Sequence, residues 1–599
     1  MTALAAGWVV LASGCATRPR LISKLVDGQV VVTRSIDPAA YEHVARSRLY
    51  QEEARYDEAV AELRRALIFD PESPELLAEL AELELALGRT KNAERAVKAS
   101  LGHAETVDAR LAAAHLRQSR GDHRGAVTEL ERATQLADFK SNADLAENAF
   151  LELAMAQVAG LDPLGARNTL RKLNEELPGS ISAKTRLAAV AWALGQLDET
   201  EQRLRDASAL EPNDLDVLLM LGWLETARGQ TADADRTFRE ILNRAEGALD
   251  VAALYARFLV GVGKARDAHL LADDVASGLP TDTASVLDMV ELERSAGLSD
   301  RALTRARAHR ASTGLDDADR ARLDLAIAGL LERREPRRAA QILMGMPASV
   351  PGYLEAQLRA AALLRTEGEL GEARRVLGRL DAEDDASLAD EIAVALAQVE
   401  KQAGNLETAL GILGKALVAR PGNHRLRLAR AALLEEAGHW KEALAAAEDI
   451  LQEDPGSAEA LNFWGFVAAE HNHALPLAEK RIRSALVFDP GSGAIIDSLG
   501  WVLFQRGAVA EAAPFLEQAA RLDPEDPEIL SHLAALYSHS GDRLRAMESL
   551  RKALDGKPAL PLRQRLEQEL RRLQDAKGAT SRGVRVRPGE SGANAGAGV

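Results

Sequence analysis

Residues 493–526 read GAIIDSLGWVLFQRGAVAEAAPFLEQAARLDPED. The first half carries apolar and small residues at helical spacing, which predicts one apolar stripe. The stripe consists of Ile496, Leu499, Gly500 and Leu503. Gly507 is predicted to end this helix, because glycine tolerates the left-handed backbone of a C-terminal cap. A second stripe follows, and Pro524 stops the chain before the next helix. The stretch therefore predicts two helices joined by a turn.

Two positions in this stretch are predicted to be small for a packing reason. Gly500 and Ala512 lie where the two helices are expected to cross with their backbones close together. A leucine at either position would force the helices apart, and overpacking of this kind costs roughly 1–3 kcal/mol. The small residues are therefore expected to set the spacing of the pair.

The same pattern recurs along the chain. Five prolines fall at intervals of 34, 35, 34 and 34 residues, at Pro421, Pro455, Pro490, Pro524 and Pro558. An alanine precedes each of them by twelve residues, at Ala409, Ala443, Ala478, Ala512 and Ala546. The register continues upstream as Ala59, Ala93, Ala126, Ala166, Thr200, Ala234, Ala268, Ala302, Ala339 and Ala373. A fixed period in this range indicates stacked copies of one supersecondary unit, here fifteen of them.

The composition favours helices over strands. Hydrophobic residues make up 47% of the 599-residue chain, but aromatic residues only 4%. Such a mix suits helices that pack closely through small side chains. The one β-branched run of note is Val30-Val31-Val32-Thr33. We therefore expect an all-α chain.

These positions resemble the tetratricopeptide repeat over about residues 40–560. The characteristic small, aromatic and proline positions recur as Trp464-Gly465, Leu499-Gly500, Leu533-Ala534 and Tyr537, beside the alanines and prolines above. The resemblance implies an all-α, right-handed α-solenoid of about fifteen helix-turn-helix repeats. Residues 300–350 match the pattern poorly, because Arg334 replaces the turn glycine. Residues 471–476 also lose the glycine and carry a one-residue insertion.

The segments outside the array have different expected roles. Residues 15–39 carry no helical stripe and read as a lipidated N-terminus and tether. Residues 561–575 read as a helix that caps the open apolar side of the last repeat, with Leu562, Leu566, Leu570 and Leu573 on one face. Residues 576–599 are rich in glycine, alanine and serine and are expected to be a disordered tail.

The first residues resemble a bacterial lipoprotein signal. An apolar run at residues 3–11 is too short to span a bilayer and is followed by Leu11-Ala12-Ser13-Gly14-Cys15. This string resembles a lipobox, which implies a signal peptide over residues 1–14 and lipidation of Cys15. Met1-Thr2 lacks the lysine or arginine that such signals normally carry. The resemblance, with alanine at position 16, implies a lipid anchor in the outer membrane, on the periplasmic side.

Composition and motifs argue against several classes of function. The formal net charge of −17 opposes broad nucleic-acid binding and fits solubility or, as an alternative, a basic partner. A single cysteine leaves no disulfide within the chain and no cysteine-based zinc site. The chain has no phosphate-binding loop, zinc-protease motif or nucleophile turn. We therefore expect neither an enzyme nor a bound metal or cofactor.

The tetratricopeptide resemblance also implies where partners would bind. In this family the first helix of each pair lines a concave face, and recognition positions fall one or two turns along it. That register selects five aromatic rings and a set of polar companions. They are Trp192, Trp223, Trp501, Phe466 and Phe504, and Asn462, Asp497, Gln505, Ser531, Ser538 and His539. An alternative left open is that the rings only pack between neighbouring first helices.

The sequence thus predicts a membrane-anchored, periplasm-facing scaffold that binds protein partners on a concave surface. By analogy with lipidated repeat proteins, it would serve envelope biogenesis, pilus assembly or polysaccharide export, although a fold does not fix a function. Two alternatives remain at this point. One is a cytoplasmic regulatory scaffold whose apparent signal is accidental, and the other is a glycan-binding accessory factor of polysaccharide export.

Overall fold

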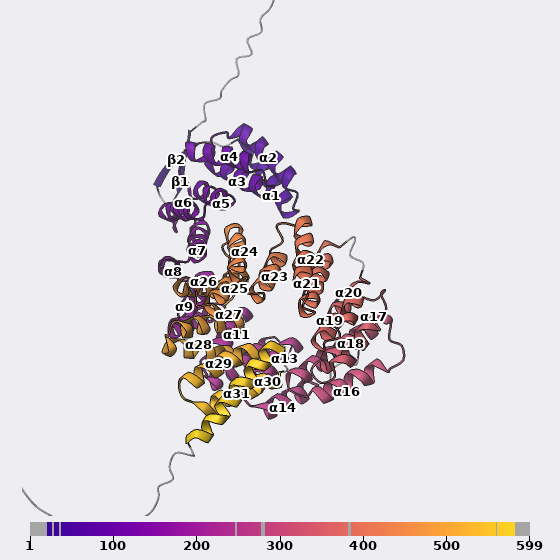
Figure 1. Ribbon diagram of the computed structural model, residues 1–599. Helices are drawn as coiled ribbons and strands as arrows, with labels where there is room; N and C mark the ends of the chain where they lie inside the picture. The colour runs from indigo at the N-terminus through magenta and orange to yellow at the C-terminus, as the bar shows by residue number, and fades with distance from the viewer. Residues whose placement is uncertain are drawn as a thin grey trace, which may run out of the picture. The chain divides into compact units, whose positions relative to one another are not determined.

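The computed structural model describes residues 21–580 apart from 27–28, 35–36, 246–247, 277–281, 381–384, 557 and 559 (Figure 1). These residues form two compact units, Met1–Ala156 and Gln157–Val599. Cys15, the signal-like segment and most of the glycine-rich tail lie outside the described residues. Lipidation of Cys15 therefore stays a prediction.

Helices alternate as first and second members of pairs along the described chain. The first helices are α1 (Pro38–Glu52), α3 (Pro74–Ala86), α5 (Val107–Gln118), α7 (Ala143–Ala159), α9 (Ile181–Ala193), α11 (Leu215–Ala227), α13 (Leu249–Gly261), α15 (Thr283–Ser295), α17 (Asp317–Leu331), α19 (Tyr353–Thr366), α21 (Ala386–Gln402), α23 (His424–Glu436), α25 (Ala458–Glu470), α27 (Gly493–Gln505) and α29 (Pro527–His539). The second helices are α2 (Tyr56–Phe69), α4 (Thr90–His103), α6 (His123–Leu136), α8 (Pro163–Glu176), α10 (Leu197–Leu210), α12 (Thr231–Arg244), α14 (Ala265–Ala276), α16 (Ser299–Arg310), α18 (Pro336–Met344), α20 (Leu370–Leu377), α22 (Leu406–Ala419), α24 (Trp440–Glu453), α26 (Leu475–Phe488), α28 (Val509–Leu522) and α30 (Arg543–Asp555). A last helix, α31 (Leu560–Thr580), follows them.

The predicted all-α repeat architecture is confirmed. Fifteen helix pairs occupy the described residues, and each second helix carries one of the fifteen register positions inferred from the sequence. All fifteen side chains at these positions, including Thr200, are at most 1% exposed. The period therefore marks a row of buried contacts, one in each pair.

The close helix crossing is also present. A Cβ added at Gly500 on α27 would lie 2.7 Å from Cγ of Leu516 and 3.0 Å from its backbone nitrogen on α28. In the preceding pair, a Cβ at Gly465 would lie 3.0 Å from the carbonyl oxygen of Ala478, the register alanine of that pair. Only a residue without a side chain fits at these two crossings.

The prolines end each repeat two residues before the next helix cap. Pro421, Pro455 and Pro490 are each followed by a glycine and then by an N-cap residue. These caps, Asn423, Ser457 and Ser492, accept a hydrogen bond from a backbone N–H of the first helical turn. Such a cap satisfies a donor that would otherwise lack an intrahelical partner.

Fourteen of the fifteen described pairs have a left-handed residue in the turn, and in two of them it is Ala54 or Leu161, which the sequence analysis did not single out. Gly507 has φ of 78°, as its predicted role as a helix end requires. The turn that contains Arg334 has no residue with positive φ, and α18 after it is only 9 residues long. In the 471–476 insertion, Asn472 and Ala474 take the left-handed conformation instead of glycine.

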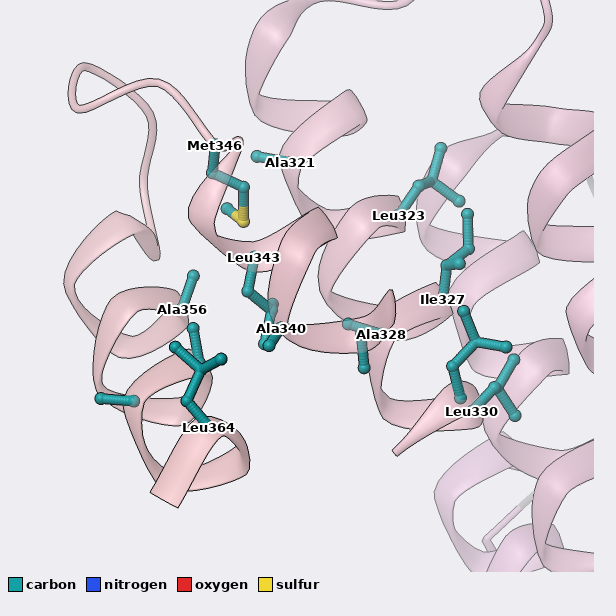
Figure 2. Packing of buried hydrophobic residues seen from close by; sticks show 14 of the residues in the cluster. Ala321, Leu323, Ile327, Ala328, Leu330, Ala340, Leu343, Met346, Ala356 and Leu364 are labelled. Carbon is teal, nitrogen blue, oxygen red and sulfur yellow. The ribbon is translucent and has the colours of Figure 1, made fainter. Parts of the chain in front are cut away.

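The irregular stretch keeps a continuous core. Leu323, Leu343 and Leu364, from α17, α18 and α19, belong to one buried cluster, part of which Figure 2 shows. Met346, in the segment after the short helix α18, is 5% exposed and joins the same cluster. A flexible methionine suits an irregular gap of this kind.

Helix α31 covers the end of the array. Leu566 is buried against Leu530 and Leu550 of the last pair. The other three leucines placed on one face by the sequence also pack on this cluster, namely Leu562, Leu570 and Leu573. The helix runs on to Thr580, beyond the end expected at residue 575.

The sequence did not predict a hairpin in the expected tether. Strands β1 (Leu21–Val26) and β2 (Gln29–Arg34) pair antiparallel, with Leu21 opposite Arg34 and Val26 opposite Gln29. The β-branched run noted in the sequence forms most of β2. The segment between the lipobox-like string and α1 is therefore partly structured.

We expect Gly500→Leu to destabilise the pair α27–α28 by roughly 1–3 kcal/mol, because the added side chain meets Leu516 at the crossing. Thermal unfolding and local amide exchange in α27 and α28 would measure the effect. The matched control is Gly411→Leu on α22, where an added Cβ meets nothing within 4 Å. Equal stability of the two variants would contradict the close-crossing assignment.

Candidate functional site

The first helices α25, α27 and α29 pack side by side and carry a group of aromatic rings. The ring of Trp501 stacks on His532 with centroids 4.2 Å apart and on Phe504 at 5.4 Å. Phe466 lies 6.1 Å from His532, and His539 meets Phe504 edge-on at 5.5 Å. We call these five residues the aromatic surface. They come from three successive repeats, so the stacking of repeats assembles the surface.

The structure brings together four residues that the sequence selected for this surface. Phe466 and Trp501 occupy equivalent places in their repeats and are half-buried, as is Phe504. His539 is exposed at the end of α29. The sequence reasoning missed His532, which holds the group together. One 34-residue period after Asp497 is position 531, and His532 is the next residue. The repeat period could therefore have pointed to His532.

One residue of the aromatic surface, His532, forms a buried ion pair. Nδ1 of His532 and Oδ2 of Asp497 are 2.6 Å apart, and both side chains are buried. Burial alone would lower the pKa of His532, but the carboxylates of Asp497, Glu470 and Glu528 outweigh it and raise that pKa. Asp497 was predicted to contact a partner directly. The structure places it beneath the surface, where it holds the imidazole.

Further polar groups surround the aromatic surface. The indole N–H of Trp501 donates to Oε1 of Glu470, which fixes the ring in one orientation. Burial raises the pKa of Glu528 on α29, with smaller contributions from neighbouring carboxylates. Of the remaining predicted residues, Asn462 and Ser538 are half-buried and Gln505 is exposed.

Two other predicted aromatic residues do not lie on this surface. Trp192 on α9 is fully buried, so its ring packs inside the unit and offers no area to a partner. Trp223 on α11 is half-buried, and an added Cβ at Gly491 would lie 3.1 Å from its ring. For Trp192 the structure therefore supports the packing alternative that the sequence left open.

In the first unit, three first helices carry a cluster of ionisable side chains. His115 on α5 has its Nδ1 2.8 Å from Glu82 on α3 and its Nε2 2.7 Å from Glu152 on α7. Burial alone would lower the pKa of His115, but the hydrogen bonds and charges of Glu152 and Glu82 outweigh it and raise the pKa to about 10. A charged imidazole thus joins three successive repeats.

We expect this ion pair to make stability depend on pH. The pKa of His115 is raised on folding, so its stabilisation is complete below the ordinary imidazole value of 6.5 and is lost as the pH rises towards about 10. The melting temperature of wild type minus that of His115→Gln should therefore fall between pH 6.5 and pH 10. Hydrogen exchange at the imidazole C2 position, read by mass spectrometry, would give the pKa of His115 directly.

The control variant is His103→Gln, at an exposed residue that ends α4. It should leave the pH dependence of the melting temperature as in wild type. A difference between wild type and His115→Gln that stays constant across this pH range would contradict the charged bridge.

The described part of the chain gives no sign of metal chemistry or of a membrane-spanning helix. Within it, histidine, cysteine and acidic side chains nowhere gather in a set of three suited to hold a metal ion. Among the helices searched there, none combines the length and apolar character that crossing a bilayer requires. The site as described is a surface of stacked rings and buried charges.

Comparison with known proteins addresses the repeat unit. A family model described as tetratricopeptide repeat matches residues 191–258, 401–463 and 503–570. Three segments of the chain are therefore similar to tetratricopeptide repeats. The third match covers α29, which carries His532 and His539 of the aromatic surface. The chain is also 28% identical over 185 residues to the TPR repeat-containing protein PA4667 of Pseudomonas aeruginosa. The match spans 30% of this chain and 30% of that relative.

Solved structures with similar repeats are only distantly alike. A chain of the crystal structure of the APC/C hetero-tetramer Cut9-Hcn1 is 16% identical, with a TM-score of 0.32, over 85% of this chain and 92% of that chain. A chain of Naa15/Naa10 bound to HypK-THB is 14% identical, with a TM-score of 0.27, over 90% and 97%. The MamA RS-1 ArsTM double mutant is 19% identical, with a TM-score of 0.24, over 30% and 97%. Likenesses at these scores say nothing about what this chain binds.

Proposed function

We propose that this protein is a lipid-anchored scaffold that faces the periplasm and binds protein partners through the aromatic surface of α25, α27 and α29. Tetratricopeptide repeats indicate a protein–protein interaction scaffold. The three segments that match the repeat model support this general role. The choice of the aromatic surface as the binding site rests on the stack of Trp501 on His532 and Phe504.

The make-up of the aromatic surface supports partner binding. Tryptophan and other large rings dominate the energetics of protein interfaces when neighbouring residues exclude water around them. The Trp501 ring is held in place by the hydrogen bond to Glu470 and by two stacked rings. A partner therefore meets a rigid ring, and little conformational entropy is lost on binding.

The polar rim gives the surface a means of selecting its partner. Gln505 and His539 are exposed beside the rings, and Ser538 is half-buried near them. A few polar groups around an apolar centre fix orientation in binding sites of this type. The assemblies that such a scaffold would serve are envelope biogenesis, pilus assembly or polysaccharide export.

We expect Trp501→Ala to remove partner binding without unfolding the array, because the ring is half-buried and lies at the centre of the surface. Affinity purification from envelope extracts, with wild type and variant as baits, would measure the recovery of each co-purified protein. A protein recovered by wild type and strongly depleted with Trp501→Ala is the expected result.

The matched control is Trp440→Ala on α24, a half-buried tryptophan that stacks on His471 outside the aromatic surface. It should recover partners as wild type does. Equal recovery by both variants and wild type would place partner binding elsewhere. If the wild type binds purified polysaccharide and Trp501→Ala does not, the result would instead favour a glycan-binding accessory factor.

The lipid anchor rests on the Leu11–Cys15 string. Cys15→Ala removes the thiol that would be acylated, so the protein should move from the membrane fraction to the soluble fraction. Fractionation followed by immunodetection of the full chain would show this. A variant that stays in the membrane fraction would contradict the anchor at Cys15. A wild type that is already soluble would also contradict it and would favour a cytoplasmic scaffold.

A further inference from the structure

Within the second unit, the last residues of α7, α9 and α11 contact two second helices, α26 and α28, that lie about 300 residues further along the chain. Oγ of Ser484 on α26 donates to the carbonyl oxygen of Val158 on α7 at 2.8 Å. Arg483, also on α26, donates through Nη1 to the carbonyl oxygen of Ala193 on α9. The hydrogen-bond partners are 326 and 290 residues apart in sequence.

The next repeat makes the same kind of contact. Arg521 on α28 donates through Nε and Nη2 to the carbonyl oxygen of Ala227 on α11, at 3.0 and 2.6 Å. Ala193 and Ala227 are the last residues of α9 and α11 and lie one 34-residue period apart. The repeat therefore presents carbonyl acceptors at regular intervals along one edge of the array.

These acceptors suit arginine for a physical reason. The last carbonyl groups of a helix have no intrahelical partner, and the C-terminal end of a helix carries partial negative charge. A guanidinium group satisfies the carbonyl and complements that charge. Burial lowers the pKa of both Arg483 and Arg521, and their side chains are 13% and 36% exposed at this contact.

Aromatic rings complete the contact on both sides. The ring of Phe515 on α28 faces Gly195, where an added Cβ would lie 3.5 Å from it. The ring of Trp223 on α11 faces Gly491, just before α27, where an added Cβ would lie 3.1 Å away. The glycine at position 491 allows the backbone to approach the tryptophan closely.

We propose that α26 and α28 act as an intramolecular ligand that closes residues 157–522 into a ring and covers α9 and α11. This contact lies on the helices of Trp192 and Trp223, the two predicted partner-binding tryptophans that are absent from the aromatic surface. The proposal goes beyond the proposed function, which rests on α25, α27 and α29. A partner for α9 and α11 must displace Arg483 and Arg521 and offer the same chemistry, a guanidinium donor beside an aromatic ring.

The test uses the full chain with Arg483→Glu and Arg521→Glu together. Each carboxylate would face helix carbonyls and the negative end of a helix, so the contact should open. Hydroxyl-radical footprinting read by mass spectrometry reports the solvent exposure of single rings. Labelling of Trp223 and Phe515 should rise severalfold, while labelling of Trp501 should stay as in wild type.

The matched control is Arg551→Glu on α30. Arg551 occupies the place in its repeat that Arg483 occupies on α26, but it is exposed. It should leave the labelling of Trp223 and Phe515 unchanged. If the double variant loses its helical circular dichroism, Arg521→Ala alone decides the question by the same measurement.

Two results would overturn the proposal. The first is a folded double variant in which Trp223 and Phe515 are labelled no more than in wild type. If the double variant is unfolded, the same result in folded Arg521→Ala would overturn the proposal. The second is a wild-type dimer by light scattering whose Phe515 protection is lost on dilution, because the contact would then join two chains.

Discussion

The close approach of two helices at one small residue is the constraint on which this structure depends. At each of fifteen positions in the described chain, the register side chain is at most 1% exposed, and fourteen of the fifteen are alanine. Interiors pack as densely as organic crystals, so small side chains suit these positions. Each pair keeps the same helix spacing, and the next pair can stack on it in the same way. The surfaces described above exist because this spacing repeats.

The aromatic surface is a direct product of that repetition. Phe466 and Trp501 occupy the same place in successive repeats, and His532 reaches the Trp501 ring from the third. A single helix pair carries at most a few of these groups. Binding capacity in such an array arises between repeats, where first helices from neighbouring pairs lie side by side.

Most of the local structure could be predicted from the sequence, because its causes are local. The apolar stripes, Gly507 in a left-handed turn and the leucines of α31 each follow from residues close together in the chain. The hairpin at residues 21–34 was missed because its β-branched run is short and stands alone. His532 was missed because its role depends on Asp497, 35 residues away on another helix. The contacts of Arg483 and Arg521 leave no periodic trace at all, since arginine on an outer helix face is ordinary in a solvated array.

The contact between α26–α28 and the ends of α9–α11 has a consequence for how this chain can evolve. Open repeat arrays lengthen or shorten by whole repeats, because each repeat touches only its neighbours. Here Ala193 must meet Arg483, and Ala227 must meet Arg521, across a fixed number of intervening pairs. One repeat gained or lost between them would rotate and shift the two edges out of register. The number of repeats in this part of the chain is thereby fixed, as the number of blades is fixed in a closed propeller.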